Sequence, residues 1–115
     1  MGYKSDRTAE DIRREITTIV REMKDPRIDP VKLTVVRTEV AHDLSYCKVY
    51  ISSLDGINSA KTACDTLNGG AKGHIRKQLG GRIDIRKIPD LKFIPDDSVE
   101  KGIEMFRKLE SVNKK

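Results

Sequence analysis

The sequence contains no tryptophan, and aromatic residues of all kinds make up only 4% of its 115 residues. It also lacks any uninterrupted apolar run of about 18 residues, which a membrane-spanning helix would need, and no apolar run follows its first residues. We therefore expect neither a membrane span nor a secretion signal, and we expect the protein to work in the cytoplasm.

Cysteine and histidine are scarce as well, with two residues of each. Cys47 and Cys64 lie in apolar patterns without Cys-x-x-Cys spacing, which predicts buried free thiols rather than a disulfide, a redox pair or a zinc site. His42 and His74 are far apart, and neither has a nucleophile or a metal-ligand pattern around it. The sequence therefore predicts no enzyme activity, no metal, no cofactor and no small-molecule substrate.

Charge is abundant, since 36% of the residues are charged, and the net charge of +5 is unevenly placed. The segment 71–88 has six basic residues and one acid, whereas the rest of the chain has 17 basic and 17 acidic residues. The six basic residues are Lys72, Arg76, Lys77, Arg82, Arg86 and Lys87. A clustered excess of this kind is typical of a protein that binds a polyanion, and a solvated basic face without a partner is the alternative.

The first half of the chain predicts one helix and two strands. Apolar residues at helical spacing predict a helix from about residue 8 to 24, which ends at Asp25-Pro26-Arg27. Branched residues predict strands at 33–40 and 45–52, joined as an antiparallel hairpin. Three arginines lie off the apolar stripe of the helix and either extend a basic face or contact solvent only. They are Arg13, Arg14 and Arg21.

The second predicted strand carries an outward face of two tyrosines and a lysine. Its alternation places Cys47, Val49 and Ile51 on one side. Tyr46, Lys48 and Tyr50 lie on the other side. Cross-strand packing explains the tyrosines, and stacking on nucleic acid bases is the alternative.

The second half predicts a helix beginning near Ala60, a third strand and a last helix. The alternation at 82–86 predicts the strand, which resumes after Pro89 through Leu91 and Phe93. Residues 95–98 cap the last helix, and the adjacent acids there are explained by capping rather than by a metal or acid pair. The apolar residues of this helix are expected on its buried side. They are Val99, Ile103, Phe106 and Leu109.

The stretch 67–79 combines a helical pattern with glycines that oppose it. Its apolar residues recur every fourth position and predict one buried stripe. They are Leu67, Ala71, Ile75 and Leu79. Gly69, Gly70 and Gly73 interrupt the same stretch, and each costs roughly 1 kcal/mol relative to alanine inside a helix. We predict that the helix bends or breaks here, or that another backbone, such as that of a nucleic acid, comes close.

Segments spread over nearly the whole chain resemble those of one family. They are Asp25-Pro26-Arg27, residues 45–52, Ala71–Arg76, Arg86–Phe93 and Asp96-Asp97-Ser98. In their order and spacing they resemble the ribosome-binding factor A family. The order of elements already indicates an α+β domain with helices on one face of a three-stranded sheet. The resemblance implies a type II KH-like fold whose usual Gly-x-x-Gly loop is replaced by an Ala-x-Gly kink, here Ala71-Lys72-Gly73.

The resemblance also implies a function. Members of this family are non-catalytic assembly factors that bind the free small (30S) ribosomal subunit, assist late maturation and processing of 16S rRNA, and are associated with cold adaptation. We expect a single domain over residues 1–115 with a core at about 8–110, acting as a monomer. The charge cluster and the kink together predict an RNA-binding surface. Its residues are Lys72, Gly73, His74, Arg76, Lys77, Arg82 and Arg86.

Three other interpretations remain open at the level of sequence. One is a protein-interaction adapter that uses the sheet or its tyrosine face. Another is a KH-like nucleic-acid binder unrelated to ribosome assembly. A duplex DNA binder is disfavoured, because the segment after the broken helix predicts a strand rather than a recognition helix.

Overall fold

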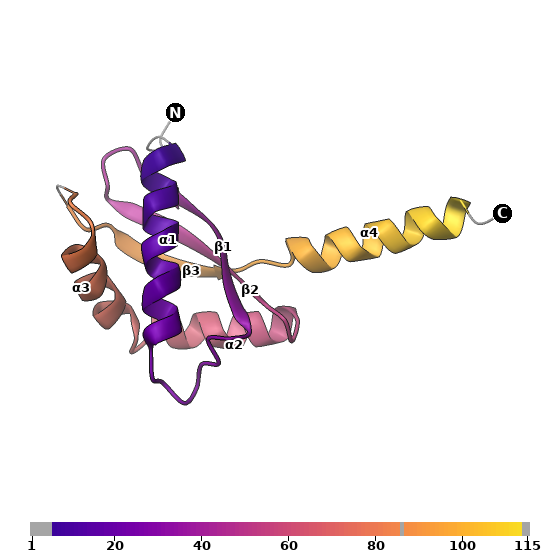
Figure 1. Ribbon diagram of the computed structural model, residues 1–115, viewed down its shortest axis with the longest axis horizontal. Coiled ribbons are helices and arrows are strands. Elements are labelled where there is room, and N and C mark those ends of the chain that lie inside the picture. Colours follow the sequence, from indigo (N-terminus) through magenta and orange to yellow (C-terminus); the bar gives the residue numbers. More distant parts are fainter. Residues whose placement is uncertain (1–5, 86, 114–115) are drawn as a thin grey trace.

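A computed structural model describes residues 6–85 and 87–113, with side chains for residues 7–85, 87–98 and 101–109. The elements follow in the order α1 (Asp6–Glu22), β1 (Leu33–Val40), β2 (Tyr46–Ser53), α2 (Ile57–Asn68), α3 (Lys72–Arg82), β3 (Asp90–Pro95) and α4 (Ser98–Asn113) (Figure 1). This arrangement confirms the predicted α+β class. The first helix lies at 6–22 rather than 8–24, and the second strand lies at 46–53 rather than 45–52.

The three strands form one sheet in the order β1-β2-β3. Strands β1 and β2 pair antiparallel, from Leu33 opposite Ser53 to Val40 opposite Cys47, which confirms the predicted hairpin. Strand β3 runs parallel to β2 along its other side. The connection between these parallel strands contains both α2 and α3, as a crossover of this kind requires.

One face of the sheet builds the core. Cys47, Val49 and Ile51 of β2 are fully buried on it, and Leu91 and Phe93 of β3 continue it. Helices α1, α2 and α3 cover this face with their apolar stripes, which confirms the prediction of helices on one side. The opposite face keeps Tyr46, Lys48 and Tyr50 in partial contact with solvent.

The cysteines lie inside this core. Cys47 and Cys64 are both free and buried, as the sequence predicted. Burial raises the pKa of each thiol to about 12, because the thiolate would lose its hydration. None of the helices in the described ranges is long and apolar enough to cross a membrane.

The structure corrects the predicted third strand at residues 82–86. Arg82 is the last residue of α3, and β3 begins only at Asp90. Gly80-Gly81 lies inside α3 and does not end it. Ile83 and Ile85 alternate with exposed residues and are both half-buried, but they belong to a loop, in which Ile83 packs against the core. Strand β2 already has a neighbour on each side, so no place beside it is left for this segment.

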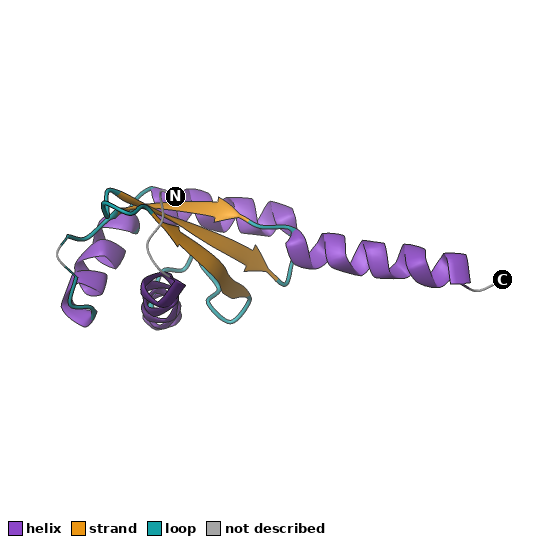
Figure 2. Cartoon of the chain, turned by 90° about the horizontal axis from the view of Figure 1, so that it is seen from above, coloured by secondary structure: helices purple, strands orange, loops and turns teal. Residues whose placement is uncertain are grey.

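The prediction for the last helix was right about its start and wrong about its burial. The Asp96 carboxylate accepts the Ser98 N–H at 2.7 Å, which confirms the cap. The side chains of Ile103, Phe106 and Leu109 are 49%, 62% and 57% exposed, however, and Val99 is outside the described side chains. Helix α4 projects away from the rest of the molecule (Figures 1 and 2), because α1, α2 and α3 already cover the core face of the sheet.

Candidate nucleic-acid interface

The helical stretch at residues 67–79 is broken into two helices, which is one of the outcomes that its glycines predicted. Helix α2 ends at Asn68, α3 begins at Lys72, and Gly69-Gly70-Ala71 forms the link between them. The predicted apolar stripe survives this break. Leu67, Ile75 and Leu79 are fully buried and Ala71 is 6% exposed, so the stripe anchors both helices to the core.

The glycines of this region differ in what they do. Gly69 ends α2 and donates its N–H to the carbonyls of Asp65 and Thr66, and a Cβ on Gly69 would lie only 3.2 Å from the Asp65 oxygen. Gly73, in the first turn of α3, has nothing within 4 Å of its Cβ position. A side chain at Gly69 would therefore crowd the end of α2, whereas the surface beside Gly73 is open to an approaching molecule.

Asn68 fixes the end of α2 to the sheet. Its side-chain amide donates to the Phe93 carbonyl at 2.8 Å, and its side-chain oxygen accepts the Phe93 N–H at 2.8 Å. The two bonds give partners to the N–H and carbonyl of Phe93 at the outer edge of β3, as a neighbouring strand would. They hold the residue immediately before the break at one place on the sheet.

Replacing Asn68 with alanine is expected to lower the free energy of unfolding by about 2 kcal/mol, because both backbone groups of Phe93 lose their partner in a partly buried place. Urea denaturation measures this change. Asn68→Asp keeps the oxygen that accepts the Phe93 N–H but places an oxygen that cannot donate against the Phe93 carbonyl, so it should also be less stable than the wild type. Equal stability of all three proteins would contradict the role of this side chain.

Three of the predicted RNA-binding cations are bonded to other parts of the chain. The Lys72 ammonium lies 3.4 Å from the Asp90 carboxylate. The Arg76 guanidinium donates to the Ile88 and Pro89 carbonyls, both at 3.1 Å. Arg82 pairs with two acids of α1, Glu22 at 2.8 Å and Glu15 at 3.8 Å. These side chains join α3 to β3, to the loop before it and to α1.

Three other predicted residues lie on one open surface. Gly73, His74 and Lys77 are all exposed, and they form what we call the kink surface. Within the described part of the chain, neither His74 nor Lys77 has a hydrogen-bond or ion-pair partner. Gly73 and Lys77 are one helical turn apart, so the glycine leaves a low surface beside the ammonium group. Arg86, also predicted here, lies outside the described residues.

A cleft that the sequence did not predict lies beside this surface. It has a volume of about 720 Å³, and the end of α1 with the loop after it, residues 22–27, lines it together with Gly70, Ala71 and His74. Arg27 donates to the Asp25 carboxylate at 2.8 Å and holds the pKa of that group at about 2. The cleft joins residues more than 40 positions apart, and the only signal for it in the sequence was the Asp25-Pro26-Arg27 segment of the family resemblance.

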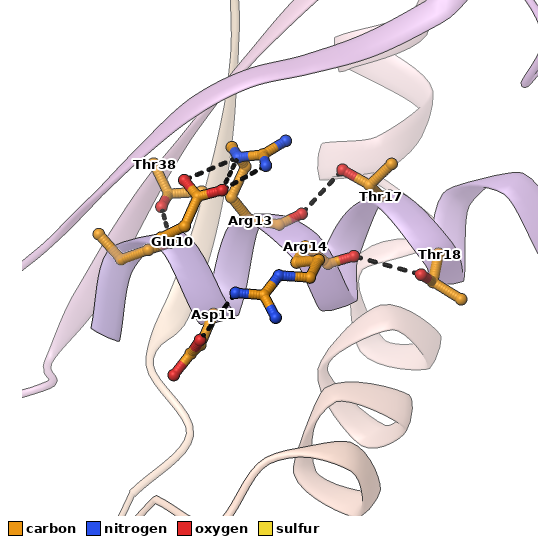
Figure 3. Close-up of polar contacts among 8 residues, drawn as sticks. Glu10, Asp11, Arg13, Arg14, Thr17, Thr18 and Thr38 are labelled. Atoms are coloured by element: carbon orange, nitrogen blue, oxygen red, sulfur yellow. Dashed lines mark hydrogen bonds and ion pairs between the residues drawn. The ribbon is translucent and has the colours of Figure 1, made fainter. Parts of the chain in front are cut away.

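The arginines at the start of α1 do not add free charge to this surface. Arg13 donates to Glu10, and Arg14 donates to Asp11 at 3.2 Å, so each is paired with an acid of its own helix (Figure 3). The Thr38 hydroxyl of β1 donates to the Ala9 carbonyl and ties this part of α1 to the sheet. Together with the two acids, these arginines therefore form a stretch of helix surface with no net charge.

The kink surface offers a positive charge and backbone N–H groups. Over residues 6–85 and 87–113, no group of three histidine, cysteine, aspartate or glutamate side chains is placed to hold a metal ion. Lys77 supplies a fixed positive charge, and the N-terminal turn of α3 adds backbone N–H groups that have no partner in the preceding turn. Both features suit the phosphate groups of a nucleic acid.

Comparison with known proteins gives a consistent result. The family model of ribosome-binding factor A matches residues 4–109. The ribosome-binding factor A of Agathobacter rectalis is 44% identical, over 98% of this chain and 93% of that protein. The protein of the same name from Nitrosomonas eutropha is 40% identical, over 90% of this chain and 87% of that protein.

Solved structures show the same fold. The crystal structure of ribosome-binding factor A from Thermus thermophilus matches with a TM-score of 0.69 at 24% identity, covering 81% of this chain and 97% of that one. A Thermus thermophilus homology model fitted into the cryo-EM map of a 30S complex matches with a TM-score of 0.63 at 23% identity, covering 79% and 93%. The chain therefore has the KH-like fold, with a break between α2 and α3 at the place of the usual loop.

Proposed function

Because this chain belongs to the ribosome-binding factor A family, we propose that it binds the free small ribosomal subunit, with its kink surface against 16S rRNA. A structural relative was fitted into the map of a 30S complex, which supports the choice of partner. The single observation that carries the choice of surface is the placement of charge. The net charge of +5 arises from the segment that begins at the break.

The exposed residues of the kink surface make the direct contacts in this proposal. Lys77 neutralises a phosphate, His74 lies at the edge of the cleft, and Gly73 lets the RNA backbone come close to α3. Lys72 and Arg82 each have a carboxylate partner, which they must exchange for a phosphate before they contact RNA. Arg76 acts as a positioning residue, because its guanidinium must leave two carbonyls before it reaches RNA.

The biological role that we propose follows from the family. The protein acts without catalysis, as a monomer in the cytoplasm, and it assists late maturation and processing of 16S rRNA. It supports growth in the cold, when RNA is slow to leave misfolded states. Sedimentation of lysate on a sucrose gradient tests this role, and we expect the protein with free small subunits rather than with complete ribosomes.

Charge reversal at Lys77 tests the surface. We expect Lys77→Glu to weaken binding to purified small subunits by roughly tenfold and to flatten its salt dependence by about one unit of slope, because one phosphate contact is lost. The matched control is Lys108→Glu, which makes the same change at an exposed position of α4. We expect this control to bind within about twofold of the wild type.

Equal affinity of the Lys77→Glu and Lys108→Glu proteins would exclude the kink surface from the contact. If a protein partner instead stays bound after nuclease treatment and at high salt, the result would favour a function as a protein-interaction adapter. Unfolding curves of both variants serve as the control for folding, since substitutions at exposed positions usually change stability by less than about 0.5 kcal/mol.

A further inference from the structure

The face of the sheet that the helices leave open presents a row of aromatic and basic side chains. In the sheet register Arg37 of β1 is opposite Tyr50 of β2, and Lys48 of β2 is opposite Lys92 of β3. Tyr46 precedes Lys48 by two positions on the same side of β2 and is 40% exposed. These five residues, Arg37, Tyr46, Lys48, Tyr50 and Lys92, define the open sheet face. It lies on the side of the sheet away from α1, α2 and α3.

The two lysines on this face are not neutralised, whereas Arg37 is paired with Glu39. Lys48 and Lys92 are direct neighbours on adjacent strands, and like charges in that position destabilise a sheet. Glu39 lies opposite Lys48 on the other side, but its carboxylate is bonded to Arg37 at 3.0 Å. Among the described residues, neither lysine has a carboxylate within ion-pair distance. An anionic group bound between the two ammonium groups would attract both and offset this repulsion.

The aromatic groups are arranged for stacking. The Arg37 guanidinium lies over the Tyr50 ring with 4.0 Å between its central carbon and the ring centroid, which confirms cross-strand packing for this tyrosine. The Arg37 side chain is still 56% exposed, so the outer face of the guanidinium plane is accessible to a base. Tyr46, with its exposed ring, stands at the other end of the row.

The spacing also fits an extended strand. Residues two apart on a β-strand are separated by about 7 Å. Along β2 an aromatic ring, an ammonium group and a second ring therefore follow one another at this distance, on Tyr46, Lys48 and Tyr50. The distance is similar to that between successive nucleotides of an extended chain. Single-stranded binding proteins combine stacking rings with basic groups in this way. A duplex would not expose its bases to these rings.

We propose that the open sheet face binds a single-stranded RNA segment, with one base on Tyr46, another on the Arg37 guanidinium, and the backbone phosphates on Lys48 and Lys92. The inference rests on the proposed function, since it takes the partner to be RNA. It adds a second contact on the side of the molecule away from the core helices. The protein would then hold structured RNA at the kink surface and an unpaired strand on the sheet.

The test measures the anisotropy of a fluorescein-labelled, unstructured oligouridine of twelve nucleotides with the full chain. Tyr46→Ala should weaken binding by roughly tenfold, because a stacked base is lost, and Tyr46→Phe, which keeps the ring, should stay within about twofold. Lys48→Glu with Lys92→Glu should also weaken binding and reduce the salt slope by roughly 1.4 units, about 0.7 for each phosphate. The matched control is Lys61→Glu with Lys108→Glu, which makes the same charge change on α2 and α4.

The outcome that overturns the inference is oligouridine binding by the Tyr46→Ala and Lys48→Glu/Lys92→Glu proteins that equals that of the matched control. Small-subunit binding by Lys77→Glu is measured in parallel. If Lys77→Glu no longer binds the small subunit while the sheet variants still bind oligouridine, the proposed function is supported and the open sheet face is not an RNA-binding surface. If Lys77→Glu still binds the small subunit while the sheet variants no longer bind oligouridine, the open sheet face binds RNA and the kink surface does not.

Discussion

Replacing Arg76 with alanine is expected to lower the free energy of unfolding by about 3 kcal/mol, because the carbonyls of Ile88 and Pro89 both lose a charged donor. The two bonds hold the loop between α3 and β3 against the helix. Without them the loop keeps only its apolar contacts with the core, and β3 loses part of its support. Chemical denaturation followed by circular dichroism measures the change.

The matched control for Arg76→Ala is Lys77→Ala, one position further along α3. Lys77 is exposed, so its removal should change the free energy of unfolding by no more than about 0.5 kcal/mol. The two variants thus separate support of the fold from contact with RNA. If Arg76→Ala unfolded like the wild type and still lost subunit binding, Arg76 would contact RNA directly, as the sequence alone predicted.

Replacing Gly73 with glutamate is expected to weaken small-subunit binding by at least about tenfold without loss of stability. The Cβ position of Gly73 is open, and a negative charge in the first turn of α3 is favourable to the helix by roughly 0.3 to 1 kcal/mol. The same charge and bulk would block and repel an RNA backbone that approaches the kink surface. Equilibrium binding to purified subunits and urea unfolding are measured on the same protein.

Gly102→Glu provides the control for Gly73→Glu. Gly102 is also a helical glycine with nothing within 4 Å of its Cβ position, and it lies in α4, away from the break. The substitution adds the same charge and size at a place without a proposed contact. If both variants bound equally well, or if both lost binding to the same extent, the open surface beside Gly73 would have no specific role.

Much of the fold was accessible from local patterns. The strand at 33–40 and the buried stripe of Leu67, Ala71, Ile75 and Leu79 were confirmed, since each depends on a periodicity that a single element carries. A break in the helix was one of the two outcomes predicted from Gly69, Gly70 and Gly73, and it falls at the first two of these glycines, whereas Gly73 lies inside α3. The family resemblance then indicated how these elements are arranged.

The errors arose where contacts between distant residues decide the outcome. Residues 82–86 alternate like a strand, but whether they form one depends on a free neighbouring edge, and β3 already occupies that side of β2. The apolar side of α4 predicts burial, but α1, α2 and α3 leave it no place on the core face. The partners of Arg76 and Arg82 within the chain were not predicted, because a sequence shows a charge without showing what it pairs with, and contact of these arginines with RNA stays a prediction.

The most direct measurement is photocrosslinking of the protein, with a photoreactive amino acid in place of Lys77, to purified small ribosomal subunits. Position 108 on α4 receives the same probe as the matched control, because both side chains are exposed on helices. We expect crosslinks from position 77 to small-subunit RNA and few or none from position 108. Crosslinks from position 77 to protein only, or equal RNA crosslinking from both positions, would contradict the assignment of the kink surface to RNA.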